Sequence, residues 1–232
     1  MRQKKFNFYG RRVGKPLNTL NKQLLETLLP RYEILPDLYK DSSIPLKKLF
    51  PKASSFSLEI GFGTGTHLFS QAKSNPFTGF IGSEPYLSGV SQLLKKLQKT
   101  PLDNLLISLK PIQELLLSLE KASLDNIYVL FPDPWPKKRH NKRRIINPSM
   151  LKVFSNYLKP SGTLTVSTDH PDYIQWIESL FEESPLVTIK NIYNLTPHQR
   201  PLNWPMTRFE KKAHQVGRIC KVYEVLLASN SP

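Results

Sequence analysis

An aspartate fixed between two prolines, next to a dense cluster of cations, is the part of this sequence best suited to chemistry. Asp133 lies between Pro132 and Pro134. Each proline fixes its own φ, and Pro134 also biases Asp133 toward extended backbone. Six of the eight residues from 137 to 144 are Lys or Arg. A rigid carboxylate beside such a strip indicates a reaction carried out on a nucleic acid.

The cluster at 137–144 and the tryptophan before it each have two interpretations. The cations could form a solubilising face. However, six cations in eight residues repel one another unless an anion offsets them, and this favours phosphate binding. Trp135 could be a platform on which a base stacks, or it could cover the core.

The overall charge points to the same class of partner. The chain has 232 residues and a formal net charge of +15. Such an excess favours a polyanion, RNA or DNA, with a membrane surface as the other candidate. No apolar run reaches the roughly 18 residues that span a bilayer, and the N-terminus lacks the apolar region of a signal peptide. A single cysteine leaves no internal disulfide and no cysteine-based zinc site. We therefore expect a cytoplasmic protein without a bound metal.

A glycine-rich turn at the end of an expected strand is the second feature with chemical meaning. Glu59, Gly61, Gly63 and Gly65 alternate in an E-x-G-x-G-x-G pattern. Glycines let the backbone turn tightly and approach a ligand closely. The dinucleotide-binding pattern G-x-G-x-x-G is not met, because residue 66 is not glycine. The turn could be purely structural, or it could be the motif I that the pattern resembles in class I S-adenosylmethionine-dependent methyltransferases.

Three acidic residues follow strands that we expect to be parallel, so they should lie at one edge of the sheet. Glu84 ends the second strand, where an acid commonly binds the ribose hydroxyls of a nucleoside cofactor. A strand-end glutamate is more often only solvated, but its pairing with the glycine-rich turn favours ribose binding. Asp133 ends the fourth strand. Asp169 follows the fifth, where it could cap the next helix or face a substrate.

The elements that position these residues alternate between buried strands and amphipathic helices. Apolar runs predict strands at 57–61, 77–83, 105–109, 126–131, 162–167, 186–193 and 219–227. Helical spacing lies between most of them, with Pro111 expected as a first helical residue and Asn147 as an N-cap. Residues 194–216 are expected to form a proline-rich loop. This alternation predicts a mainly parallel, doubly wound α/β sheet.

We expect the chain to divide into residues 1–52, a basic N-terminal arm followed by a lead-in segment or short helices, and residues 53–232, the sheet domain. The arm is either a solvated tail or a phosphate contact. Its cations are Arg2, Lys4, Lys5, Arg11, Arg12 and Lys15.

Together these residues resemble the bacterial tRNA (guanine-N7-)-methyltransferases. The resemblance rests on LEIGFGTG at 58–65 and FPDPWPKKRHNKRR at 131–144, followed in the family's order by Thr168-Asp169 and TRFE at 207–210. It extends from about residue 56 to 227. It implies a Rossmann-like class I methyltransferase fold with a seven-stranded, mostly parallel sheet. It also implies methyl transfer from S-adenosylmethionine to N7 of a guanine in the tRNA variable loop, by a monomer or homodimer.

The resemblance further implies roles for single residues, with Asp133 matching the catalytic acid. The implied cofactor-binding residues are Glu59, Gly61, Gly63, Gly65, Glu84 and Asp133. The implied substrate-binding residues are Lys137, Asp169, Thr207, Arg208, Phe209 and Glu210. The implied RNA-binding residues are Arg139, His140, Asn141, Lys142, Arg143 and Arg144.

One departure from the family supports an alternative. The family usually has an acid after the third strand, at the adenine end of the cofactor, and Pro111 occupies that position here. Gln113, Glu114 or backbone groups could substitute. The alternative is an RNA-binding protein with a degenerate methyltransferase fold. A methyltransferase of small molecules or proteins would not need the cationic strip, and the glycine spacing disfavours a nicotinamide-dependent oxidoreductase.

Overall fold

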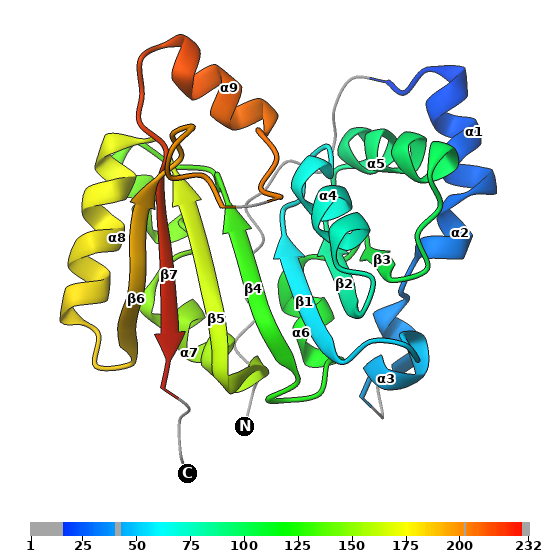
Figure 1. Ribbon diagram of the computed structural model, residues 1–232, viewed down its shortest axis with the longest axis horizontal. Helices are drawn as coiled ribbons and strands as arrows, with labels where there is room; N and C mark the ends of the chain where they lie inside the picture. The colour runs from blue at the N-terminus through cyan, green and yellow to red at the C-terminus, as the bar shows by residue number, and fades with distance from the viewer. Residues whose placement is uncertain (1–15, 40–42, 202, 229–232) are drawn as a thin grey trace.

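A seven-stranded sheet forms the centre of the computed structural model, which describes residues 16–39, 43–201 and 203–228 (Figure 1). The basic arm at residues 1–15 therefore lies outside the described residues. The strand order is β3-β2-β1-β4-β5-β7-β6. Only β7 runs antiparallel to its neighbours, so the mostly parallel sheet that the sequence predicts is confirmed. The strands are β1 (Ser55–Ile60), β2 (Thr78–Ser83), β3 (Leu105–Ser108), β4 (Leu124–Leu130), β5 (Leu158–Thr168), β6 (Val187–Asn194) and β7 (Lys221–Leu227).

Helices cover both faces of the sheet. On one face α1, α4 and α5 enclose a hydrophobic cluster over β2 and β3, and on the other α6, α7 and α8 pack over β1, β4, β5 and β7. Figure 1 shows α4 and α5 in front of the sheet and α7 behind it. The helices are α1 (Thr19–Thr27), α2 (Leu29–Tyr32), α3 (Leu46–Leu49), α4 (Thr66–Ser74), α5 (Leu87–Lys99), α6 (Ile112–Leu117), α7 (Pro148–Tyr157), α8 (Pro171–Glu183) and α9 (Arg208–Gln215), with short 3-10 helices η1 (Pro36–Tyr39) and η2 (Lys138–Arg143).

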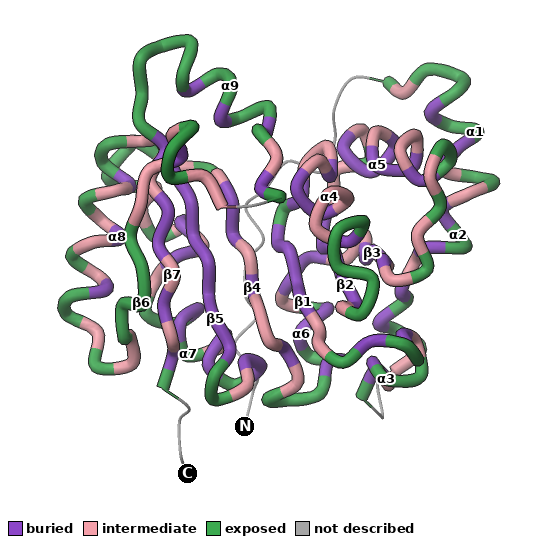
Figure 2. The backbone as a smooth tube through the Cα atoms, viewed as in Figure 1, coloured by how far each residue is buried: buried purple, intermediate pink, exposed green. Residues whose placement is uncertain are grey.

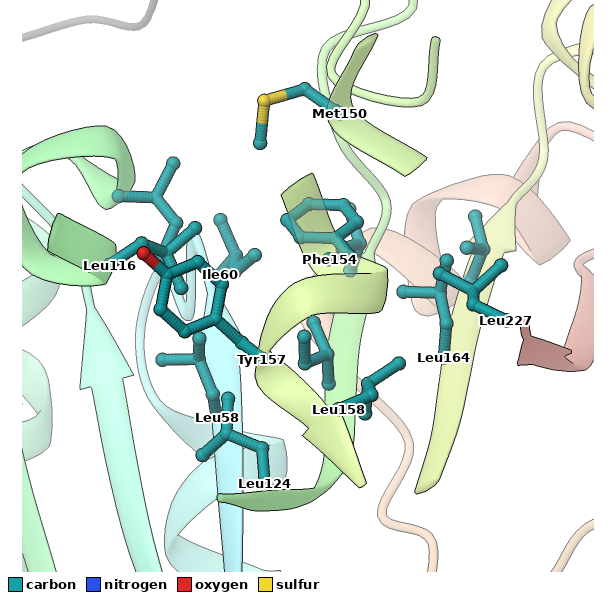
Figure 3. Close-up of a cluster of buried hydrophobic side chains, with 14 of the residues drawn as sticks. Leu58, Ile60, Leu116, Leu124, Met150, Phe154, Tyr157, Leu158, Leu164 and Leu227 are labelled. Carbon is teal, nitrogen blue, oxygen red and sulfur yellow. The ribbon is translucent and has the colours of Figure 1, made fainter. Parts of the chain in front are cut away.

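The larger cluster anchors α7, the helix that follows the cationic segment. Its Phe154 is fully buried, and Met150 and Tyr157 pack beside it against strand residues such as Leu58 and Leu164 (Figure 3). The N-terminus of α7 is fixed as the sequence predicts, because the Asn147 side chain accepts a hydrogen bond from the Met150 amide at 3.0 Å. The segment that precedes α7 is therefore tied to a rigid base.

The segment before β1 contributes to the core as well. It contains the short helices α1, α2 and α3 and buries Tyr32, Ile44, Leu46 and Phe50. Within the part of the chain that the structure describes, no helix is long and apolar enough to cross a membrane.

Two local expectations were wrong. Pro111 is the N-cap of α6 rather than its first helical residue, with an extended ψ of 147°. The expected loop at 194–216 contains α9, which begins with a capping box. The Thr207 hydroxyl accepts from the Glu210 amide at 3.2 Å, and the Glu210 carboxylate accepts from the Thr207 amide at 3.3 Å. The T-x-x-E pattern signals such a start, but proline-rich surroundings and a mostly polar helix obscured it.

Candidate active site

A cavity of about 1000 Å³ lies at the carboxyl edge of the sheet, next to the ends of β1, β2 and β4. In this fold class ligands bind at that edge, where the strand order reverses. The cavity brings together many of the residues singled out from the sequence. These are Gly61, Gly63, Glu84, Asp133, Phe209, Asn141, Lys142, Arg143 and Arg144.

The other residues singled out from the sequence do not line this cavity. They are Glu59, Gly65, Lys137, Arg139, His140, Asp169, Thr207, Arg208 and Glu210. Some of these lie on the surface around it, whereas others are engaged in contacts inside the protein.

Glu59 faces away from the cavity. Side chains alternate between the faces of a strand, and Ile60, its neighbour in β1, lines the cavity. The Glu59 carboxylate instead accepts a hydrogen bond from His67 Nδ1 at 2.8 Å. Both side chains are buried, and the His67 ring packs against Tyr128 and Trp204. Glu59 thus holds α4 against the sheet beneath the glycine-rich turn. No pattern in the sequence identifies His67 as its partner.

The glycine-rich turn requires the conformations that glycine adopts easily. Gly61, Gly63 and Gly65 have φ values of +70°, +55° and +65°, which other residues adopt only with strain. The turn is also packed tightly from α5, because a Cβ on Gly89 would lie 2.3 Å from the Gly63 carbonyl oxygen. The backbone of the turn is therefore held in place where it borders the cavity.

Glu84 is the buried acid of the cavity. Its carboxylate accepts hydrogen bonds from the Gly63 and Tyr86 amides, both at 2.9 Å. Burial raises the pKa of Glu84, and the nearby carboxylates of Asp133 and Glu59 raise it further. The hydrogen bonds from the two backbone amides lower it in part. Each carboxylate oxygen can accept a second hydrogen bond, so the group can still bind hydroxyls of a ligand.

Gln113 offers an acceptor near the position where the family's acid is missing. It lines the cavity, and its side-chain oxygen is buried without a hydrogen-bond partner among the described residues. Glu114 is exposed and lies 3.8 Å from Lys110. Of the two residues considered from the sequence, only Gln113 is in position to contact a ligand there.

Asp133 is exposed at the mouth of the cavity, in a segment held in an unusual conformation. Phe131 and Trp135, on either side, have φ values of +51° and +46°, a strain of about 1–3 kcal/mol for each residue. Such strain persists only where the surrounding contacts enforce it. Asp133 is therefore positioned by its neighbours.

Arg144 provides one of these contacts. Its Nε donates to the Pro134 carbonyl at 2.8 Å, and its guanidinium lies 4.9 Å from the Tyr173 ring and 5.3 Å from the Trp176 ring. Only 2% of Arg144 is exposed, and burial lowers its pKa. The structure thus places Arg144 inside the protein, as an anchor for the Asp133 segment, rather than with the exposed cations of the strip.

Aromatic side chains form further walls of the cavity. Trp135 is half-buried, with the Arg143 guanidinium 4.9 Å from its ring centre. Phe131 and Phe209 stack with their ring centres 6.2 Å apart. A flat ligand that enters the cavity would therefore meet aromatic faces. The exposed cations around its mouth are Lys137, Lys138, Arg139 and Lys142.

Two acidic residues expected to face a substrate have partners in the protein. Asp169 lies 3.2 Å from Arg218 and does not cap α8, whose N-cap is His170. Glu210 is fully buried and pairs with Arg200, a residue that the sequence did not single out. Within the described residues, no group of three or more His, Cys, Asp or Glu side chains could hold a metal ion.

Comparison with known proteins decides the family. A family model described as "Putative methyltransferase" matches residues 53–223. The tRNA (guanine-N(7)-)-methyltransferase of Rhodospirillum rubrum is 38% identical over 213 residues, which cover 91% of this chain and 84% of that protein. The protein of the same name from Azorhizobium caulinodans is 38% identical over 218 residues, covering 91% of both. The chain belongs to the tRNA (guanine-N7-)-methyltransferase family.

Solved structures confirm the fold of this family member. An antibiotic-related methyltransferase has a TM-score of 0.60 at 17% identity, covering 84% of this chain and 95% of the other. The 16S rRNA methyltransferase KamB has a TM-score of 0.59 at 16% identity, covering 78% of this chain and 92% of the other. The class I methyltransferase fold predicted from the sequence is therefore confirmed.

Proposed function

We propose that this protein transfers a methyl group from S-adenosylmethionine to N7 of a guanine in the tRNA variable loop, forming 7-methylguanosine. The observation that carries this proposal is the position of Asp133. It lies at the mouth of a large cavity that is also lined by residues of the cationic segment. A cofactor in the cavity and a nucleotide held by its phosphates could meet there.

The cavity fits S-adenosylmethionine. It is large enough for a nucleoside cofactor, and it contains a buried carboxylate and an unpartnered acceptor. Glu84 would accept hydrogen bonds from the ribose hydroxyls, and the Gln113 oxygen would accept from the adenine amino group. Gly61 leaves open space beside the backbone. The cofactor, when bound, supplies a methyl group that is already electrophilic.

Asp133 would act electrostatically rather than as a strong base. Guanine N7 presents a lone pair and has no proton to lose, so positioning supplies much of the rate. Methylation leaves a positive charge on the guanine ring. A carboxylate held near that ring stabilises the charge as it develops. The strained, anchored backbone around Asp133 keeps the carboxylate in place for this role.

The surroundings of the cavity would bind the RNA. Lys137, Arg139 and Lys142 are exposed and would bind phosphates. The base has to leave its stack to reach the cavity, and Trp135 and Phe209 offer surfaces on which it can stack again. We propose that the protein acts in the cytoplasm, where tRNA is modified, as a monomer or homodimer.

The test is methyl transfer from labelled S-adenosylmethionine to an unmodified tRNA transcript. The modified site is mapped by chain scission at 7-methylguanosine. We expect wild-type protein to label one variable-loop guanine, and Asp133→Asn to lower the rate constant about 10²–10³-fold. Asp103→Asn is the control, since Asp103 is an exposed acid before β3, at the other edge of the sheet. Wild-type protein that binds tRNA but transfers no methyl group would instead support the degenerate RNA-binding alternative.

A further inference from the structure

Helix α9 is exposed along most of its length. It stands above the carboxyl edge of the sheet, where Figure 2 shows it mostly exposed. Only Glu210 and Ala213 of its residues are buried. Phe209, near its start, lines the cavity and stacks on Phe131, so the helix begins at the cavity mouth and extends away from it.

The exposed face of α9 carries three cations. Arg208, Lys211 and Lys212 are spaced i, i+3 and i+4, so they are neighbours on one face of the helix. None of them pairs with a carboxylate of the described residues. The only acid in the helix, Glu210, is buried against Arg200. This face is therefore positively charged, and the described part of the chain supplies no carboxylate to pair with it.

This arrangement is unfavourable for the isolated protein. Like charges at these spacings destabilise a helix by about 0.2–0.5 kcal/mol per pair. Arg208 and Lys211 also lie at the N-terminal end, where the helix dipole favours anions. An external polyanion would reverse both effects. The capping box and the Arg200–Glu210 pair meanwhile hold the helix in position.

We propose that Lys211 and Lys212, beside Arg208, whose substrate contact the family resemblance implies, form a second phosphate-binding surface, which binds the backbone of the tRNA independently of the cationic strip at 137–143. The cavity mouth would then be bordered by two cationic elements, one from the segment after β4 and one from the segment after β6. Two separate contacts fix the orientation of the RNA as well as its position. This inference rests on the proposed function, because it takes tRNA as the partner.

The test is the salt dependence of equilibrium binding between the full chain and an unmodified tRNA transcript. Each phosphate contact contributes about 0.7–0.9 to the slope of log affinity against log salt concentration. We therefore expect Lys211→Gln/Lys212→Gln to reduce the slope by about 1.5 and to raise Kd about tenfold near 0.1 M salt. Affinity for S-adenosylhomocysteine should stay at the wild-type value.

Two paired variants serve as references. Lys138→Gln/Arg139→Gln removes the same charge from the strip and should reduce the slope similarly. Lys48→Gln/Lys52→Gln removes the same charge from exposed positions before β1, at the opposite edge of the sheet. This variant should leave the slope unchanged. Combining the α9 and strip variants should add the two reductions, because the surfaces are separate.

An unchanged slope in the α9 variant would overturn this inference and leave methyl transfer untouched. A changed oligomeric state with an unchanged slope would also overturn it, and would mark α9 as a protein interface. Wild-type protein that binds tRNA without methylating it would contradict the proposed function, while the slopes would still decide whether α9 contacts RNA.

Discussion

Burial and the proposed ligand binding have opposite effects on the protonation of Glu84. Burial raises its pKa, so the folded protein holds the proton more tightly than the unfolded chain does. Protonation of this group therefore favours folding, and its contribution to stability falls as pH rises from the ordinary value of 4.5 through the raised pKa. Ribose hydroxyls prefer the ionised carboxylate, so ligand affinity should change in the opposite sense.

We expect the affinity for S-adenosylhomocysteine to fall as pH is lowered through the raised pKa of Glu84, with the decline beginning above pH 4.5. Glu84→Gln should bind about 10–100-fold more weakly at neutral pH, because a charged acceptor is lost, and its pH profile should be flat. Calorimetric titration between pH 4.5 and 8 measures the affinity of each protein and its pH profile. Glu114→Gln, outside the cavity, should keep the wild-type profile. An unaltered profile in Glu84→Gln would assign the pH dependence to another group.

Single residues also show what the sequence cannot provide. Arg139 and Arg144 lie in one cationic run, yet the first is exposed and the second is buried over Tyr173 and Trp176. The run indicates that these side chains are charged but not whether each one points outward or inward. For Arg144 this depends on the aromatic side chains of α8. Likewise the motif identifies Glu59 but not His67, because strand alternation turns Glu59 away from the cavity.

At the scale of elements, α9 depends on very few contacts. Its position relies on a capping box, on the pair between Glu210 and Arg200, on the stacking of Phe209 on Phe131 and on Ala213, which packs in a small buried cluster. Removing one partner of a buried ion pair costs about 3–5 kcal/mol. Since most of α9 is exposed, that cost should appear as local opening of the helix rather than as unfolding of the sheet.

We expect Glu210→Gln to increase amide hydrogen exchange in residues 208–215 at least about 100-fold, which corresponds to the lower end of that cost. Exchange in β4 and β5 should be unchanged. Mass spectrometry after proteolysis resolves the two regions, and Glu182→Gln, an exposed acid on α8, is the control. Equal loss of protection in the sheet would show that the pair stabilises the whole domain instead.

The strands were predicted within a few residues and α9 was not predicted, for a physical reason. Parallel strands buried on both faces are nearly continuous apolar runs, so their positions are apparent in the sequence. Helix α9 buries only one face lightly and has no apolar stripe. Its only local signal is the T-x-x-E pattern at its start, within a segment that otherwise resembles a loop.

For the molecule as a whole, topology makes the site predictable. The strand order reverses between β1 and β4, and their carboxyl ends border the crevice where this fold binds ligands. Glu84 and Asp133, which follow β2 and β4, therefore both line the cavity, whereas Asp169, after β5, does not. Segments that are far apart in the sequence close the cavity, from the turn after β1 to the start of α9, and their side-chain packing depends on long-range contacts. Gln113 is one example, since only the structure shows that its oxygen is buried and has no hydrogen-bond partner in the described part of the chain.

Filling the cavity should stabilise the whole domain, because a ligand that binds only the folded state shifts the folding equilibrium. At a concentration 100 times its Kd, S-adenosylhomocysteine should add about 2.7 kcal/mol, or about 5–10 °C in Tm for a chain of this size. A nicotinamide dinucleotide should produce no shift, and scanning calorimetry compares the two directly.

The same measurement tests the proposal that adenine binds beside Gln113. Gln113→Leu keeps a side chain of similar size but removes the acceptor. If Kd then rises about tenfold, the stabilisation at an unchanged ligand concentration falls by about 1.4 kcal/mol, and the shift in Tm falls by about 3–6 °C. Glu114→Gln should retain the full shift, because that side chain lies outside the cavity. A full shift in Gln113→Leu would mean that backbone groups bind the adenine instead.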